Sequence, residues 1–194
     1  FLAGTGDKVA VLSVCVPGKR FNEEYISLSL GNKQKWCDGR DDAVCLMFDS
    51  RIDPTSTKHA KWDKLLRIRS AMVDLDPFKV QWIMWLDCDA IFTNFEIDWR
   101  TRTGDAKVDA GMVVAKDGNG YNLGVFLLQN TPETRGWIER MIGSIDQVDN
   151  ALWARLFGGH KDQEALRLLM KANQTVESRT RNVPQQWMNS FFEH

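Results

Sequence analysis

The sequence has no long apolar run, no excess of one charge and no visible signal peptide. None of its apolar stretches approaches the length that a membrane-spanning helix needs. Contact with a membrane is therefore expected only through a segment absent from this chain. The 25 Lys and Arg residues nearly balance the 26 Asp and Glu residues, for a net charge of -1. No basic surface is predicted, so no nucleic-acid partner is expected.

The sequence has few cysteines, and their spacing argues against the common zinc motifs. Cys15, Cys37, Cys45 and Cys88 include no CxxC pair. Cys15 lies in an apolar run and is expected to be a buried free thiol. Cys37 and Cys45 flank a polar turn and can pair if the compartment is oxidising.

Short apolar runs and amphipathic stretches alternate along the first half of the chain. Strands are predicted at 8–16, 43–49, 80–87, 110–118 and 122–130. Helices are predicted at 22–37, 61–76, 132–145, 148–157 and 162–173, with a final extended segment at 181–192. The alternation indicates an α/β fold with a mainly parallel sheet.

Two of the predicted helices begin with good capping residues. Asn22 can cap the first, and Thr131, followed by Pro132 at the first helical position, can cap the third. In the first helix, Tyr25, Leu28 and Trp36 are expected to lie on one helical face.

An acidic pair ends the third predicted strand, in "WIMWLDCDAIFTN" from Trp82 to Asn94. Side chains alternate along an extended chain, so Asp87 and Asp89 are expected to point the same way while Cys88 points back. In α/β sheets, ligands bind at the carboxyl ends of the strands. Two carboxylates there suit Mg²⁺ or Mn²⁺ together with a phosphate-bearing ligand. An acidic turn after the strand, either solvated or paired with Lys and Arg, is the alternative interpretation.

The same segment resembles the DxD segment of retaining glycosyltransferases with the GT-A fold. It is most similar to the GMA12/MNN10 family of galactosyl-, mannosyl- and xylosyltransferases. Four further segments match that family in order, and the likeness covers about 58–191. They are "AKWDKLLRIRSAM", "YNLGVFLLQN", "DQEAL" and "VPQQWMNSF". The resemblance implies a GT-A fold: a Rossmann-like, mainly parallel sheet flanked by helices that binds a nucleotide sugar.

The resemblance also implies where the metal and the donor lie. Asp87 and Asp89 would hold Mn²⁺ or Mg²⁺ and the donor diphosphate. Lys64 lies near the region where the family binds its nucleotide and is a candidate donor-binding residue. A solvated helix charge is the alternative for Lys64, as it is for Arg67 one turn later.

The remaining candidate residues come from two other matching segments. Asn122 and Gly124 would line the sugar pocket, where a glycine lets the backbone approach the ligand closely. Asp162 and Gln163 would lie beside the anomeric carbon as the catalytic pair. A Gln is a poor nucleophile, so the resemblance favours a short-lived oxocarbenium ion over a covalent intermediate.

The chain departs from the family pattern at two places. Cys88 replaces the usual Ser, and because it is expected to face away from the metal, its replacement by Ser is expected to be nearly silent. The family ends with a Gly-Asp-x-x-x-His segment whose His completes the metal's ligands, whereas this chain stops at Glu193-His194. The expectation is a single GT-A catalytic domain over 1–194, truncated at its C-terminal end and lacking that ligand.

The predicted function is therefore a metal-dependent retaining glycosyltransferase. It would move a hexose or pentose from a UDP- or GDP-linked donor to a glycan or glycoconjugate acceptor. The expected location is the Golgi lumen for a full-length eukaryotic protein and the cytoplasm otherwise. One alternative is a non-catalytic nucleotide-sugar or carbohydrate-binding domain. Another is a haloacid-dehalogenase-type phosphatase, but there the acidic pair sits on the first strand and Thr or Val takes the place of Ile91.

Overall fold

The computed structural model describes residues 8–18, 20–56, 60–103, 110–118, 120–150 and 161–188. The strands described are β1 (Lys8–Val14), β2 (Ala43–Phe48), β3 (Val80–Leu86), β4 (Met112–Asp117), β5 (Gly120–Gln129) and β6 (Thr180–Val183). The helices described are α1 (Glu23–Asp38), α2 (Trp62–Asp74), α3 (Arg100–Thr103), α4 (Pro132–Gly143), α5 (Ile145–Asn150), α7 (Lys161–Ala172), α8 (Gln174–Ser178) and α9 (Gln185–Met188). None of these helices is long and apolar enough to cross a bilayer.

The strands form one mixed sheet in the order β2-β1-β3-β5-β4-β6. β1 pairs in parallel with β2 and β3, and β4 pairs in parallel with β6. β5 is antiparallel to both of its neighbours, β3 and β4. The predicted α/β fold with a mostly parallel sheet is confirmed. Because β5 runs against β3, the first half of β5 lies beside the carboxyl end of β3, where Leu86 pairs with Val125.

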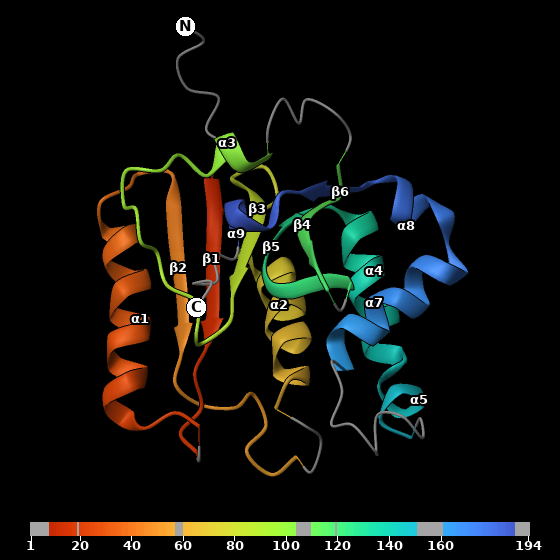
Figure 1. The fold of residues 1–194 in the computed structure, drawn as a ribbon, viewed down its shortest axis with the longest axis horizontal. Coiled ribbons are helices and arrows are strands. Elements are labelled where there is room, and N and C mark those ends of the chain that lie inside the picture. Colours follow the sequence, from red (N-terminus) through yellow and green to blue (C-terminus); the bar gives the residue numbers. More distant parts are fainter. Residues whose placement is uncertain are drawn as a thin grey trace, which may run out of the picture.

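Helices cover both faces of the sheet (Figure 1). On one face, α2, α4 and α7 pack over a large core that includes Leu12, Ile83, Trp85 and Phe126. On the other face, Trp36 and Cys37 of α1 pack over a second core with Val11 and Met84. Alternate strand residues face the two cores, as burial of both faces requires.

The predicted helix caps are confirmed, but the predicted face of α1 is wrong at Tyr25 and Leu28 and right at Trp36. The Asn22 side chain accepts a hydrogen bond from the Tyr25 backbone N–H at 2.8 Å, and Thr131 forms a capping box before α4. Tyr25 and Leu28, expected inside, are 38% and 69% exposed. Trp36 is buried as expected, and the other buried residues of α1 are Ile26, Ser29, Lys33 and Cys37. This helix turns polar side chains inward because they have partners at the end of β3, as described below.

The later segments differ from the prediction in three places. The segment from 181, expected to be extended throughout, is β6 followed by the short helix α9, with Pro184 between them. The short helix α8 and the one-turn α3 carry no pattern that predicted them. Of the helix expected at 148–157, only the part within α5 is described, and the rest lies outside the described residues.

The cysteines form two disulfides, Cys15–Cys88 and Cys37–Cys45. The free thiol expected at Cys15 is therefore wrong. Cys15 and Cys88 each follow the end of a strand, and β1 and β3 are parallel neighbours, so the two Cα atoms are 5.0 Å apart. Sequence spacing alone leaves three pairings open for four cysteines, and strand adjacency decides between them.

Two glycines should respond oppositely to substitution by alanine. A Cβ at Gly111 would overlap the ring of Trp137, which is 1% exposed. Gly31 lies in the interior of α1, and nothing lies within 4 Å of a Cβ built there. Gly111→Ala is expected to lower the free energy of unfolding by about 1–3 kcal/mol, and Gly31→Ala to raise it by about 0.5–1 kcal/mol. Urea unfolding monitored by Trp fluorescence measures both; equal effects would contradict this packing.

Candidate active site

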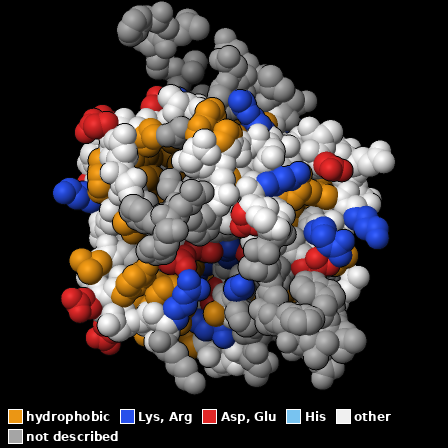
Figure 2. Space-filling model, in the orientation of Figure 1, with side chains coloured by type: hydrophobic (Ala, Val, Ile, Leu, Met, Phe, Trp, Pro, Cys, Tyr) orange, Lys and Arg blue, Asp and Glu red, His pale blue; other side chains and the backbone are white. Residues whose placement is uncertain are grey.

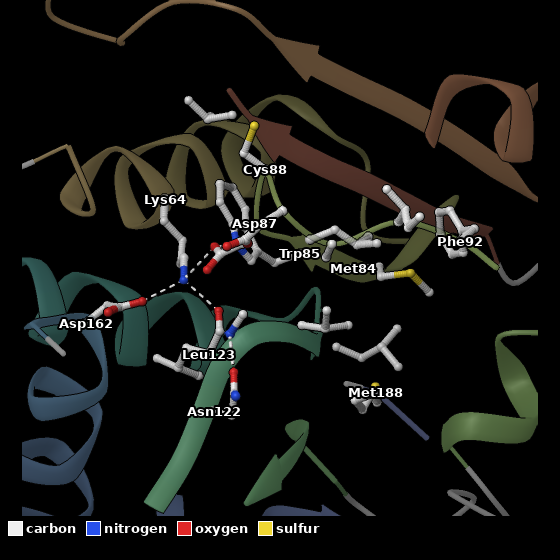
Figure 3. Close-up of a pocket in the computed structure, with 18 of the residues that line it drawn as sticks. Lys64, Met84, Trp85, Asp87, Cys88, Phe92, Asn122, Leu123, Asp162 and Met188 are labelled. Atoms are coloured by element: carbon white, nitrogen blue, oxygen red, sulfur yellow. Dashed lines mark hydrogen bonds and ion pairs between the residues drawn. The ribbon is translucent and has the colours of Figure 1, made fainter. Parts of the chain in front are cut away.

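A pocket of about 1060 Å³ lies at the carboxyl ends of β1 and β3. Its polar lining comes from several separate segments, among them Arg20 after β1, Lys64 on α2, Asp87 after β3, Asn122 on β5 and Asp162 on α7. Figure 2 shows acidic and basic side chains lying side by side near the middle of this face, next to hydrophobic ones. In Figure 3, Met84, Phe92 and Met188 form an apolar side of the pocket, opposite the charged side at Lys64 and Asp162.

Lys64 is the centre of the charged side. Its Nζ lies 2.6 Å from Asp162 Oδ2 and 3.0 Å from Asp87 Oδ1, and it donates to the Leu123 carbonyl at 2.6 Å (Figure 3). Lys64 is 5% exposed and Asp162 is 4% exposed. The alternative of a solvated Lys64 is therefore wrong. Arg67 is also not simply solvated, since its guanidinium stacks 3.8 Å from the centre of the Phe48 ring.

The charges of this cluster depend on each other. Burial alone would lower the pKa of Lys64, but Asp162 and Asp87 outweigh that effect and raise this pKa above its ordinary value. Burial alone would raise the pKa of Asp162, but Lys64 outweighs it, and the pKa of Asp162 lies below its ordinary value. Burial raises the pKa of Asp87; Lys64 opposes the rise, and the charge of Asp162 adds to it. Lys64 and Asp162 thus stay ionised at neutral pH, while Asp87 is harder to ionise than an ordinary aspartate.

The acidic pair is placed by a turn, not by strand alternation. β3 ends at Leu86, and the Ala90 N–H donates to the Asp87 carbonyl at 3.0 Å. Both carboxylates line the pocket, but they have different partners. Asp87 accepts a hydrogen bond from Trp85 Nε1 at 2.7 Å, and Asp89 pairs with Arg20 at 2.5 Å. The expectation that the segment stays extended through Asp89 is wrong, because the hydrogen-bonded turn begins at Asp87.

Cys88 is buried behind this turn, in a small cluster with Cys15 and Ile26. Its side chain does lie away from the Lys64 cluster, as Figure 3 shows. However, the expectation that replacement by Ser is nearly silent is wrong, because the replacement would remove the Cys15–Cys88 disulfide.

Asn122 and Gly124 line the pocket from a bent part of β5. The register with β4 shifts here, since Val114 pairs with Phe126 but Ala115 pairs with Asn122. The Asn122 side chain bridges the bend: Nδ2 donates to Asp117 Oδ2 at 2.8 Å, and Oδ1 accepts from the Gly124 N–H at 2.8 Å. The Gly124 carbonyl accepts from the Asp87 N–H at 2.7 Å, so this bend is tied to the acidic turn.

Gln163 lies in the first turn of α7, beside Asp162, and lines the same pocket. Its Oε1 is buried and accepts no hydrogen bond from any residue that the structure describes. A buried acceptor left unpaired costs about 1–3 kcal/mol. A ligand hydroxyl or amide that donates to this oxygen would remove that cost.

The donor atoms of the pocket fit a hard cation that takes the rest of its shell from water and phosphate. Asp87 and Asp89 supply two carboxylates on one turn, and Asp87 shares its lysine with Asp162. Over the part of the chain that is described, no group of three His, Cys, Asp or Glu residues is placed to hold a metal ion.

Two cationic residues near the acidic turn were missed by the sequence analysis. Arg20 pairs with Asp89, and Lys33 donates to the Asp87 carbonyl at 3.0 Å. Arg20 lies in the loop after β1, and the rule that ligands bind at the carboxyl ends of strands could have singled it out. Lys33 was missed because the apolar face predicted for α1 did not include it.

Comparison with known proteins identifies the family and the fold. The sequence profile of the galactosyl transferase GMA12/MNN10 family matches residues 7–102 and 98–194. No curated protein matches the chain. Among solved structures, a glycosyltransferase involved in the glycosylation of the major capsid of PBCV-1 superposes with a TM-score of 0.69 at 12% identity, covering 92% of this chain and 82% of its own. At that identity the likeness shows the fold, which is GT-A-like. A 4-diphosphocytidyl-2C-methyl-D-erythritol synthase from Anaerococcus prevotii superposes with a TM-score of 0.46 at 11% identity, covering 92% and 89%.

Removing the central lysine should destabilise the fold in a pH-dependent way. Lys64→Met leaves two carboxylates without their cation, one of them buried, and breaking a buried pair costs about 3–5 kcal/mol. The loss should be largest at neutral pH and shrink as the pH falls towards about 4, the ordinary carboxyl pKa, because protonation of Asp162 removes the unpaired charge. Urea unfolding at several pH values measures this. Lys79→Met is the control, since the Lys79 side chain is 79% exposed; a pH-independent loss in Lys64→Met would contradict the ion-pair account.

Proposed function

Because the chain belongs to the galactosyl transferase GMA12/MNN10 family and is a glycosyltransferase, we propose that it moves a hexose or pentose from a UDP- or GDP-linked donor to a hydroxyl group of a glycan or glycoconjugate. We propose further that it requires Mn²⁺ or Mg²⁺ and retains the configuration of the sugar. The observation that carries this proposal is the meeting of Asp87, Lys64, Asp162 and Gln163 in one pocket at the carboxyl end of β3.

The carboxylates of Asp87 and Asp89 are the groups that would hold the metal. A divalent cation bound there would neutralise the diphosphate as it leaves the sugar. Arg20 and Lys64 already lie against these two carboxylates, at 2.5 and 3.0 Å, and supply further positive charge for the diphosphate oxygens. The apolar side of the pocket, at Met84, Phe92 and Met188, keeps water away from the reacting sugar and so favours transfer over hydrolysis.

The partners of the carboxylates bear on the route by which retention would occur. Asp87 and Asp162 share Lys64, Asp89 pairs with Arg20, and Asp117 accepts from Asn122. Each of these four carboxylates therefore already has a cationic or hydrogen-bonding partner, which makes it a weaker nucleophile than a free carboxylate. Gln163, next to Asp162, carries a neutral amide that is a poor nucleophile.

A reaction on one face of the sugar needs no protein nucleophile. The bond between the anomeric carbon and the diphosphate oxygen breaks, and its electron pair goes to the diphosphate. The acceptor oxygen then bonds to the same face of the short-lived oxocarbenium ion, and its proton passes to the departing phosphate oxygen. Asp162, held ionised by Lys64, can accept hydrogen bonds from the donor's hydroxyl groups. Gln163 lines the same pocket, and its buried Oε1 is an acceptor that no described residue uses.

The disulfides bear on where the protein works. Cys15–Cys88 and Cys37–Cys45 both lie in the described part of the chain. Disulfides persist in oxidising compartments and are rare in the cytosol. They therefore support a lumenal location, such as the Golgi, over a cytoplasmic one.

Metal binding and nucleotide binding are expected to depend on each other. Two carboxylates leave most of an octahedral shell to water and phosphate, so Mn²⁺ should bind weakly alone and more tightly with UDP or GDP. Asp87→Asn and Asp89→Asn should each weaken the metal-linked binding about tenfold or more. Isothermal titration calorimetry with UDP and GDP, with and without Mn²⁺, measures this. Asp38→Asn, at an exposed position on α1, is the control; undiminished binding in both site variants would sink the assignment.

Gln163 should matter for transfer more than for binding. Gln163→Ala removes the unpaired oxygen without touching the Lys64 ion pairs, so the fold and the diphosphate affinity should be kept. The rates of transfer and of donor hydrolysis should fall about tenfold or more, as when an enzyme loses one polar contact to its transition state. Turnover of the full-length protein with its preferred nucleotide sugar is the measurement, and Gln174→Ala, in the first turn of α8, is the control.

Two results would redirect the interpretation. Turnover equal to wild type in Gln163→Ala would remove this residue from the catalytic centre. A wild-type protein that binds the nucleotide sugar but neither transfers nor hydrolyses it would support a binding domain instead.

A further inference from the structure

Lys33 is a fully buried lysine whose hydrogen-bond acceptors are all neutral oxygens. It is 0% exposed. Its Nζ donates to Ser29 Oγ at 2.8 Å, to Ser13 Oγ at 3.0 Å and to the backbone carbonyls of Asp87 at 3.0 Å and Cys88 at 3.4 Å. Burial lowers the pKa of Lys33 to about 8, against the opposing charges of Asp87 and Asp89. A charge buried in this way is costly, so its partners indicate what it holds in place.

The partners of Lys33 are the back of the acidic turn. Ser13 Oγ donates to the Leu86 carbonyl at 2.8 Å, and Ser29 Oγ donates to the Cys88 carbonyl. With Lys33 on the Asp87 carbonyl, three consecutive carbonyl groups, those of residues 86–88, are held by side chains from β1 and α1. These hydrogen bonds, on the side of the turn away from the pocket, therefore fix the orientation of its peptide planes.

The same turn has a covalent attachment on this side. The Cys15–Cys88 disulfide joins the middle of the turn to the chain just after β1. The carboxylates of Asp87 and Asp89 lie on the pocket side of the turn, where they meet Lys64 and Arg20. The backbone between them is thus fixed while its two side chains stay available to the pocket.

We propose that Lys33 is a positioning residue for the donor site: with Ser13 and Ser29 it holds the backbone of residues 86–88 so that Asp87 and Asp89 face the pocket in the geometry that binds a metal–diphosphate ligand. This inference rests on the proposed function, because it assigns Lys33 to the same site. Lys33 does not itself line the pocket and acts only through the backbone of the turn.

A purely structural role for Lys33 predicts something different. If Lys33 only stabilises the packing of α1, its removal lowers the unfolding free energy but leaves the ligand affinity of the folded protein unchanged. If Lys33 positions the turn, its removal weakens ligand affinity at temperatures where the protein remains fully folded. Supporting groups behind metal ligands typically contribute about 10–100-fold to metal affinity.

The test compares Lys33→Met with Lys35→Met, a matched change at an exposed position of the same helix. Hydrogen exchange without ligand reports the turn through the Ala90 amide, which bonds to the Asp87 carbonyl at 3.0 Å. Titration calorimetry with Mn²⁺ and UDP or GDP reports the site. Lys33→Met should exchange at Ala90 about tenfold faster and bind the metal–diphosphate ligand about tenfold more weakly or worse. Lys35→Met should match the wild type in both measurements.

Wild-type exchange at Ala90 together with wild-type affinity in Lys33→Met would overturn the inference, whatever the change in thermal stability. If Lys33→Met does not fold, Ser29→Ala decides instead, since it removes one of the backbone bonds and little volume; it should raise exchange at Ala90 and weaken binding several-fold. Failure of the proposed function would look different. In that case the wild-type protein would bind no metal–diphosphate ligand, and the exchange rates alone would show whether Lys33 holds the turn.

Discussion

The buried cation of Lys64 joins four parts of the fold that are distant in sequence. It rises from α2, pairs with Asp87 at the end of β3 and Asp162 at the start of α7, and bonds the Leu123 carbonyl in the bend of β5. A lysine can stay charged there only because its carboxylate partners offset the cost of burial. This ion-pair cluster therefore ties the start of α7, where Gln163 lies, to the carboxyl end of β3.

Most of the fold could be predicted from the sequence because its strands are short apolar runs between clear turn residues. β1, β2, β3, β4 and β5 all lie where the hydrophobic pattern placed them, and Asn22 and Thr131 cap their helices as expected. The hydrophobic pattern gave a wrong prediction where the buried side chains are polar. α1 buries Ser29 and Lys33 and exposes Leu28, because the residues behind the acidic turn need hydrogen-bond partners more than apolar contact. The spacing of apolar residues cannot reveal a need for buried hydrogen-bond partners.

In the candidate site, the residues could be predicted but their contacts could not. Asp87, Asp89, Asn122, Asp162 and Gln163 were predicted from motif resemblance, and the structure brings all five to one pocket. The contacts that hold them could not be predicted, since these depend on which strands are neighbours. The antiparallel course of β5 places Gly124 against Asp87, and the adjacency of β1 and β3 makes the Cys15–Cys88 disulfide possible. Both facts belong to sheet topology, which no local stretch of the sequence carries.

The charged groups around the pocket nearly cancel before any ligand enters. In the described part of the chain, four carboxylates (Asp87, Asp89, Asp117 and Asp162) lie at the pocket with three cations of its lining (Arg20, Lys61 and Lys64) and with Lys33 behind the turn. A site of this kind favours a ligand with no net charge, because an uncompensated charge in a partly buried cavity costs free energy. The diphosphate of a nucleotide sugar carries as much negative charge as a divalent metal ion carries positive. Under the proposed function, the metal and the donor would therefore enter most favourably as one electroneutral unit, and the affinity of that unit would depend only weakly on ionic strength.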